Sequence, residues 1–351
     1  MRIYDAEKRI LNDFFKNLER REKAVWTKYL EIAGHVVRVV NYSPEFTKLF
    51  NDQLPFVLRD KADQYETTVI LWKNNGTKEI IEKFYADNFK SGFKAIPDGS
   101  LEIFENDFAR TIVNVNEFNN SQIIARDSAR NVYYYSVRNL DMEEFRKQGH
   151  LLVKVLYQIF QNIPQASLVH GAAVGADRKG VLICARGGGG KSTLTVSTLL
   201  EKDFEYVSDD YLILSRRGKE VYSHPIYSVI TLSPEMRKKL SRLRAEFVYD
   251  NWNKTKHILN ISQYHDKFVG ELPIRVCMFP HIIKGEKPTI EPMAKGKAIA
   301  QMVDSTIMQL GSKGDFPQTQ KLLSFLRDFD FYKINLSQNL KANVDILKKF
   351  I

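Results

Sequence analysis

Residues 180–200 read GVLICARGGGGKSTLTVSTLL, and this stretch decides the fold. Its first part, residues 181–185, is a short uncharged run, as expected for a strand buried in the middle of a sheet. Four consecutive glycines follow, and residues 192–200 predict a helix. A strand, a glycine-rich loop and a helix in this order indicate a phosphate-binding loop in an α/β domain. A flexible loop that precedes a lysine by chance would not explain the flanking strand and helix.

The loop offers the groups that a bound triphosphate needs. Glycines let the backbone turn inward and point its N–H groups at phosphate oxygens, because no Cβ stands in the way. Lys191 can reach the β- and γ-phosphates, and the Ser192 hydroxyl can bind Mg²⁺. The formal P-loop (Walker A) pattern is missed only at its first position, where Ala185 replaces glycine. The residues predicted to bind ATP are Arg186, Gly187, Gly188, Gly189, Gly190, Lys191, Ser192 and Thr193.

A pair of carboxylates follows at the end of the next predicted strand. Asp209 and Asp210 come directly after FEYVS, where a magnesium-binding carboxylate should lie so that the metal bridges protein and phosphates. Two adjacent carboxylates can also divide the work, one binding Mg²⁺ with Ser192 and the other accepting the proton of an acceptor hydroxyl. The sequence leaves open which aspartate does which, and the alternative is an Asp-Asp turn without a function.

A histidine on an earlier predicted strand is the third candidate. His170 stands in LVHGAA, on a strand that we expect to lie beside the loop. We predict that it supports the acceptor side of a catalytic set with Lys191, Asp209 and Asp210. The alternative is a strand histidine that only packs against its neighbours.

The segments around the loop predict the architecture of the C-terminal part. Strands are expected over residues 166–174 and 204–207, with a turn over residues 176–180 between the first of them and the strand that carries the loop. Two further strands follow, in YLIL after Asp210 and in EVYSHP after a turn. This order predicts an α/β core in which antiparallel hairpins flank the strand that carries the loop.

The N-terminal part shows a different pattern. Residues 5–31 predict a charged amphipathic helix, because apolar residues that include Trp26 and Leu30 recur at helical spacing. Strands are predicted at residues 34–42, 67–73, 101–115 and 131–137, and helices from Ser43-Pro44-Glu45 onward and over residues 141–162.

Two domains follow from this change of pattern and from the length of the chain. We predict a smaller, mainly β α+β domain over residues 1–150 and an ATP-binding catalytic domain over residues 151–351. The first domain is expected to present the acceptor or to bind a partner. Its long predicted helix is compatible with a homo-oligomer, although packing within its own domain explains the helix as well.

The composition excludes several classes of protein. With 44% hydrophobic and 27% charged residues among 351, the chain can bury a core without disulfides or structural metals. No segment reaches the roughly 20 apolar residues of a membrane helix, and the first residues lack the apolar core of a signal peptide. Cys184 and Cys277 stand in apolar strand-like runs and are expected to be buried, reduced thiols. We therefore expect a cytoplasmic protein with no membrane partner.

The net charge of +10 raises the question of nucleic acid as a partner. The 52 lysines and arginines are scattered among acidic residues, and the densest cluster, RKKLSRLR at residues 237–244, is expected on one short helix. A solvated helix face explains this cluster, and a basic rim that attracts ATP or an acidic substrate is the alternative. No helix-turn-helix, zinc or RNA-binding signature occurs, so the sequence does not favour nucleic acid.

Three segments in order, LVHGAAVG, VLICARGGGGKSTL and FEYVSDDYLIL, resemble the HPr serine kinase/phosphorylase family. Its free-standing relatives include kinases found beside the biosynthesis of ribosomally made, modified peptides. In that family a strand with a histidine and a glycine precedes the phosphate loop, and an aspartate pair follows the loop's helix. His170, Lys191, Ser192, Asp209 and Asp210 match these positions. Weaker likeness at residues 226–236 and 272–280 extends the resemblance over about half of the chain, from roughly residue 165 to 340.

The resemblance implies a P-loop kinase domain of the HPr kinase/phosphoenolpyruvate carboxykinase type. It further implies ATP- and Mg²⁺-dependent transfer of the γ-phosphoryl group to a serine-type hydroxyl, with one aspartate of the pair acting as base. The chain departs from the family at Arg186, where the HPr enzymes carry an aspartate, and in lacking their C-terminal signature. The resemblance therefore does not extend to reverse phosphorolysis or to HPr itself as the substrate.

Two other functions compete with a kinase. One is a regulator or assembly factor that binds a nucleotide without useful turnover, which the intact Lys191, Ser192 and Asp-Asp set argues against. The other is a nucleoside triphosphatase without phosphoryl transfer, including one associated with nucleic acid. The sequence leaves the hydroxyl-bearing acceptor open among a protein serine, a peptide and a small molecule.

Overall fold

The computed structural model describes residues 23–73, 94–95, 100–103, 111–115, 121–127, 130–137, 150–185, 187–243, 249–251, 254–285, 287–310 and 316–351. These residues divide into two compact units. The first contains residues up to 31, 35–48 and those between 58 and 137, and the second contains residues 32–34, 49–57 and those from 150 onward. No helix in the described part of the chain has the length and apolar character needed to cross a bilayer.

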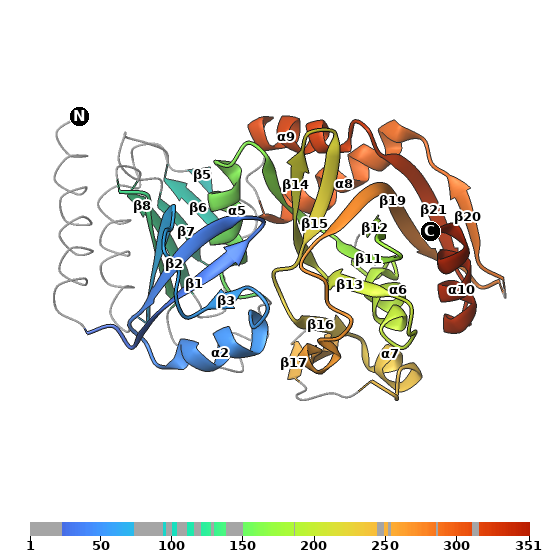
Figure 1. Cartoon of the computed structure of the whole chain (residues 1–351), viewed down its shortest axis with the longest axis horizontal. Helices are drawn as coiled ribbons and strands as arrows, with labels where there is room; N and C mark the ends of the chain where they lie inside the picture. Colours follow the sequence, from blue (N-terminus) through green and yellow to red (C-terminus); the bar gives the residue numbers. More distant parts are fainter. Residues whose placement is uncertain are drawn as a thin grey trace. The chain divides into compact units, whose positions relative to one another are not determined.

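The first unit is built on one sheet of nine strands in the order β3-β1-β2-β4-β9-β8-β7-β6-β5 (Figure 1). The strands are β1 (Trp26–Ile32), β2 (His35–Asn41), β3 (Leu58–Arg59), β4 (Thr67–Lys73), β5 (Lys94–Ala95), β6 (Ser100–Ile103), β7 (Thr111–Val115), β8 (Ser121–Asp127) and β9 (Val132–Val137). β2, β4 and β9 confirm the strands predicted at residues 34–42, 67–73 and 131–137. They pair in parallel, and apolar residues alternate between the two faces of the sheet.

The helix predicted over residues 5–31 is wrong at its C-terminal end, where β1 forms instead. Trp26 and Leu30 are four residues apart, a spacing that fits a helix and also one face of a strand. The burial alternates with period two, because Leu30 and Ile32 are buried and Glu31 between them is exposed. Residues 5–22 lie outside the described residues.

The second unit is a mixed α/β unit with two sheets. The larger sheet has nine strands, in the order β10-β14-β15-β19-β12-β11-β13, with β21 pairing β19 and β20 pairing β21. Its strands are β10 (Ala166–His170), β11 (Ala172–Ala176), β12 (Lys179–Ile183), β13 (Glu205–Ser208), β14 (Tyr211–Arg217), β15 (Glu220–His224), β19 (Leu272–Ile282), β20 (Thr289–Pro292) and β21 (Asp330–Leu336). A small sheet joins β16 (Val229–Leu232), β18 (Lys254–Asn260) and β17 (Tyr249–Asn251).

Helices cover both faces of the larger sheet. The helices that the structure describes in the whole chain are α2 (Glu45–Gln53), whose residues divide between the two units, α5 (Val153–Gln161), α6 (Lys191–Thr198), α7 (Pro234–Lys239), α8 (Lys295–Leu310), α9 (Phe316–Leu326) and α10 (Leu340–Phe350), with a short 3₁₀ turn at Ser262–Tyr264. One apolar cluster joins the sheet to α8 and α9, and a second joins its other face to α6 and α10. Along β12, Leu182 belongs to the first cluster, and Val181 and Ile183 belong to the second. These contacts confirm that the strand before the loop is buried on both faces.

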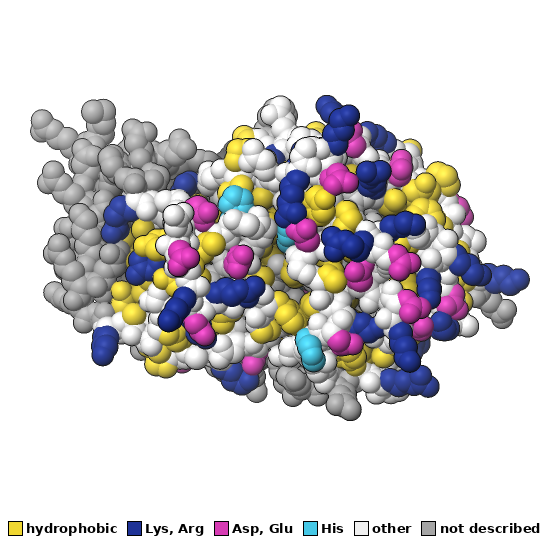
Figure 2. Space-filling view, viewed as in Figure 1, with side chains coloured by type: hydrophobic (Ala, Val, Ile, Leu, Met, Phe, Trp, Pro, Cys, Tyr) yellow, Lys and Arg dark blue, Asp and Glu magenta, His cyan; other side chains and the backbone are white. Residues whose placement is uncertain are grey.

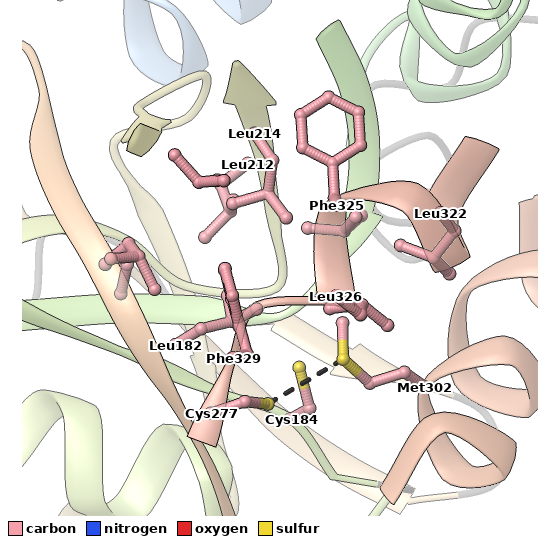
Figure 3. Close-up of a cluster of buried hydrophobic side chains, with 14 of the residues drawn as sticks. Leu182, Cys184, Leu212, Leu214, Cys277, Met302, Leu322, Phe325, Leu326 and Phe329 are labelled. Atoms are coloured by element: carbon pink, nitrogen blue, oxygen red, sulfur yellow. Dashed lines mark hydrogen bonds between the residues drawn. The ribbon is translucent and has the colours of Figure 1, made fainter. Parts of the chain in front are cut away.

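The two cysteines lie in the cluster under α8 and α9 (Figure 3). Both are free and buried, as predicted. The Cys277 Sγ lies 3.7 Å from the Met302 Sδ, and Figure 3 shows Cys184 beside them. Burial, together with the neighbouring Cys184, raises the pKa of the Cys277 thiol well above its usual value. The thiol therefore stays protonated and packs as an apolar side chain.

The predicted strand over residues 166–174 is two strands, β10 and β11, with a break at Gly171. β10 pairs with β14 and β11 pairs with β13, while Asp209 and Asp210 join β13 to β14. The two pairs thus form one bent ribbon, and the sheet curls. A Cβ on Gly171 would lie 3.2 Å from the Cys184 Sγ, so glycine allows the close packing at this bend.

Three further expectations need correction. The hairpin β14-β15 lies beyond β19 rather than beside β12, whose neighbours are β11 and the parallel β19. The helix predicted over residues 141–162 begins at Val153, because Leu152 has a left-handed φ of 64°; residues 141–149 lie outside the described part. The basic cluster is not one helix, since α7 ends at Lys239 and the following Leu240 and Leu243 are buried.

Candidate active site

The glycine loop connects β12 to α6, as the sequence predicts. Gly188 and Gly190 have φ values of 85° and 98°, a left-handed conformation that side chains other than glycine rarely adopt. Gly190 is the N-cap of α6, so Lys191, Ser192 and Thr193 form the first turn of that helix. Arg186 lies outside the described residues.

The Lys191 side chain joins the loop to the aspartate pair. Its Nζ lies 2.8 Å from the Asp209 Oδ1 and 2.5 Å from the Asp210 Oδ1. The side chains of Lys191, Asp209 and Asp210 are 7%, 0% and 19% exposed. The site is therefore a desolvated cation between two carboxylates, and only Asp210 keeps appreciable contact with solvent.

The bend in the ribbon sets the positions of the two aspartates. Asp210 has a φ of 65°, which turns the chain sharply between β13 and β14. The Gly171 N–H donates to the Asp210 carbonyl at 2.9 Å, and the Tyr211 N–H donates to the Asp209 carbonyl at 2.9 Å. A left-handed aspartate is strained but tolerated when the surrounding structure fixes it, and such residues concentrate at functional sites.

His170 lies at the end of β10, across the bend from the aspartates. Its Nε2 is 3.8 Å from the Asp210 Oδ1, and its backbone N–H donates to the Thr306 Oγ1 at 3.1 Å. β10 is far from β12 in the order of the sheet, so His170 does not lie on a strand next to the loop. The curl of the sheet nevertheless brings its imidazole to the aspartate pair.

The three charges shift one another's pKa values. Burial would lower the pKa of the Lys191 ammonium, but Asp209 and Asp210 raise it above its usual value. Burial and the neighbouring Asp210 raise the pKa of the Asp209 carboxyl, against the effects of Lys191 and the Ser192 hydroxyl. Burial would also raise the pKa of Asp210, but Lys191, His170 and His150 hold it well below its usual value. Asp210 is thus the aspartate that stays ionised and partly open.

Two residues near Asp210 were not singled out from the sequence. His150 packs edge-on against Tyr211, with ring centroids 5.0 Å apart, and lies 4.4 Å from the ring of Tyr227. Tyr211 follows Asp210 directly and also lies 5.3 Å from the ring of His170. Tyr211 could have been found by its place after the aspartate pair. No local signal marks His150, because it precedes α5 and reaches the site only through the fold.

The donor set suits a magnesium ion bound together with phosphates. The Oδ2 of Asp209 is buried and makes no hydrogen bond within the described residues, so one carboxylate oxygen is available as a ligand. Ser192 lies close enough to lower the pKa of the same carboxyl. No group of three or more His, Cys, Asp or Glu side chains within the described ranges is arranged to hold a metal. Mg²⁺ is usually held by one or two carboxylates together with substrate phosphates and water.

Comparisons with known proteins give a structural likeness and no sequence match. No family model matches the sequence, and no curated protein matches it. Among solved structures, the chain is similar to the Hpr(Ser) kinase/phosphatase from Coxiella burnetii, with 11% sequence identity and a TM-score of 0.29. The likeness covers 52% of this chain and 97% of that chain. A likeness of this strength establishes neither an activity nor a substrate for this chain.

Proposed function

We propose that this chain is an ATP- and Mg²⁺-dependent kinase that transfers the γ-phosphoryl group to a serine-type hydroxyl. The observation that carries the proposal is that the Lys191 ammonium contacts both Asp209 and Asp210. The lysine of a glycine-rich loop reaches two carboxylates from the end of another strand, and an imidazole lies behind one of them. A structural ion pair would need only one carboxylate, and it would not need a loop of four glycines.

The loop residues would hold the triphosphate. The left-handed Gly188 and Gly190 turn the backbone so that its N–H groups are available to phosphate oxygens. The Lys191 ammonium has three N–H donors, and two of them serve Asp209 and Asp210. The third N–H suits a phosphate oxygen, so the lysine can link the nucleotide to the aspartate pair. Arg186, Gly187, Gly189 and Thr193 complete the predicted loop.

The two aspartates would divide the work. Asp209 is fully buried and lies near Ser192, so these two residues would bind Mg²⁺, which neutralises charge on the phosphate oxygens when bound. Asp210 is partly exposed and faces His170, so it would act as the base. The acceptor hydroxyl gives its proton to Asp210 as its oxygen forms the new bond to phosphorus. The bond to the bridging oxygen breaks, and ADP leaves.

The fold proposed for the catalytic unit is that of the HPr kinase/phosphoenolpyruvate carboxykinase type. Its support in this chain is a loop strand with an antiparallel neighbour on one side and a parallel one on the other, and the aspartate pair at the bend. The catalytic domain would be residues 151–351, with residues 1–150 presenting the acceptor. Residues 49–57 pack within the catalytic unit, since Gln53 accepts hydrogen bonds from the backbone N–H groups of Leu151 and Ser228.

A comparison of two conservative variants tests this division of roles. Asp210→Asn should lower phosphoryl transfer by about 100-fold or more, the usual effect of losing a general base, while Mg·ATP still binds. Asp209→Asn should weaken Mg²⁺-dependent ATP binding itself. Binding is measured by calorimetry with and without Mg²⁺, and transfer with γ-labelled ATP. If both variants bind and turn over ATP like the wild type, the aspartate pair is only a turn.

A further inference from the structure

An exposed isoleucine borders the glycine loop. Ile282 ends β19, and 49% of its surface is exposed. In the described part of the chain, the other exposed large apolar residues are Val25, Tyr65 and Leu200. Because a single exposed apolar side chain is ordinary, its position decides whether it has a meaning.

Ile282 lies beside the phosphate loop, on the strand next to the one that precedes the loop. A Cβ added to Gly190 would lie 3.3 Å from the Ile282 Cγ1 and 2.8 Å from the Leu336 Cδ1. Ile282 and Leu336 are partners in the parallel pair of β19 and β21, and the Ile283 N–H donates to the Leu336 carbonyl at 2.9 Å. β12 and β19 are also parallel, so the end of β19 and the start of the loop share one edge of the sheet.

A bound nucleoside triphosphate offers two kinds of group near Ile282, its phosphates and its base. Phosphate oxygens gain nothing from an isoleucine, because the side chain offers no hydrogen bond and no charge. A nucleoside triphosphate also carries a flat, largely apolar base, joined to its phosphates through one ribose. An apolar side chain beside a phosphate loop, at the carboxyl end of parallel strands, therefore fits the base.

We propose that Ile282 contacts the base of the bound nucleoside triphosphate and contributes to its affinity. The inference rests on the proposed function, since it requires the triphosphate to occupy the glycine loop. Ile282 is thus a binding residue, and the exposed half of its side chain is covered when the nucleotide binds. Leu336, its register partner on β21, is buried and also lies beside Gly190.

Two ligands distinguish a contact with the base from support of the loop. Mg·ATP and Mg·tripolyphosphate carry the same phosphate chain, but only ATP has a base. We expect Ile282→Ala to weaken Mg·ATP binding by about tenfold, in line with the apolar area involved, and to leave tripolyphosphate binding unchanged. Ile282→Val, a milder change, should give a smaller loss for ATP alone. Both affinities are measured by calorimetry.

Leu200→Ala is the matched control, because Leu200 is also an exposed apolar residue of this unit, 39% exposed at the other end of the loop helix. It should bind both ligands like the wild type. Equal weakening of ATP and tripolyphosphate by the Ile282 variants would overturn the inference, since the residue would then only support the loop. An unchanged ATP affinity would also overturn it. If the wild type binds neither ligand, the proposed function itself fails, which is a different result from either of these.

Discussion

Replacing Lys191 with alanine would leave two carboxylates facing each other without a cation. Asp209 is fully buried, and the side chain of Asp210 is only 19% exposed, so solvent screens their repulsion poorly. Removing one partner of a buried ion pair costs about 3–5 kcal/mol, because the remaining charge stays desolvated. This is a large part of the total stability of about 5–15 kcal/mol that is usual for a folded domain. We therefore expect Lys191→Ala to lower the free energy of unfolding by about 3 kcal/mol at pH 8.

The size of this loss depends on pH with a definite sign. Without the ammonium, the pKa of the Asp209 carboxyl in the folded protein lies above its unfolded value of about 4. Ionisation of this group then opposes folding. The penalty is absent below about pH 4, where the carboxyl is protonated in both states, and it grows as the pH rises toward the folded pKa. The loss caused by Lys191→Ala should accordingly be smaller at pH 5 than at pH 8.

Urea unfolding at both pH values measures the loss. The double variant Lys191→Ala/Asp209→Asn should recover more than half of it at pH 8, because the second change removes the unpaired buried charge. The control is Lys348→Ala, which breaks an exposed ion pair with Asp203 and should change stability little. An unpaired buried charge is not the cause of the loss if Lys191→Ala costs no more stability than Lys348→Ala, or if the effects of the two changes in the double variant simply add.

Three further predictions concern the loop, a half-buried lysine and the ring beside Asp210. Gly188→Ala should destabilise the protein by about 1 kcal/mol because its φ is 85°, whereas Gly187→Ala, at a position without a left-handed φ, should be neutral in the same thermal unfolding assay. Burial lowers the pKa of Lys321 to about 8. Between pH 8 and about 10.5 the unfolded chain therefore binds more protons than the folded one, so the free energy of unfolding rises with pH. As the pH rises from 8 to 10, the wild type should gain about 1–2 kcal/mol of unfolding free energy relative to Lys321→Met. A difference in urea unfolding that does not change with pH would contradict this. His150→Ala should lower kcat by about tenfold with unchanged ATP affinity. His150→Phe keeps a ring against Tyr211 and should retain most of the activity. Equal kcat values for the wild type and both variants would argue against a role for the ring.

The sequence predicts the loop and its neighbours well because local chemistry determines them. Four consecutive glycines are unfavourable inside a strand or a helix, so they predict a loop between the two, and β12 and α6 confirm the strand and helix on either side. The aspartate pair was found for the same reason, since it directly follows a short apolar strand. The roles of Lys191, Asp209 and Asp210 are proposals that rest on their burial and mutual distances.

The errors have a common physical origin in contacts between distant residues. The strand β1 was read as a helix because the spacing of Trp26 and Leu30 fits both periods, and only pairing within the sheet decides between them. The close packing at the Gly171 break involves Cys184, a residue that directly follows β12. His150 packs against Tyr211 and Tyr227, which come much later in the chain, so only the fold brings it near Asp210. No local pattern contains such information.

The fate of the γ-phosphoryl group tests the central claim most directly. The purified wild type is incubated with γ-labelled ATP and Mg²⁺, alone and with an extract of its source cells, beside Asp210→Asn as a variant that should still bind ATP. We expect label to move to a hydroxyl-bearing protein, peptide or small molecule with the wild type and not with Asp210→Asn. Label released only as inorganic phosphate, or ATP bound without any loss of its γ-phosphoryl group, would contradict it and would indicate a nucleoside triphosphatase or a nucleotide-binding regulator.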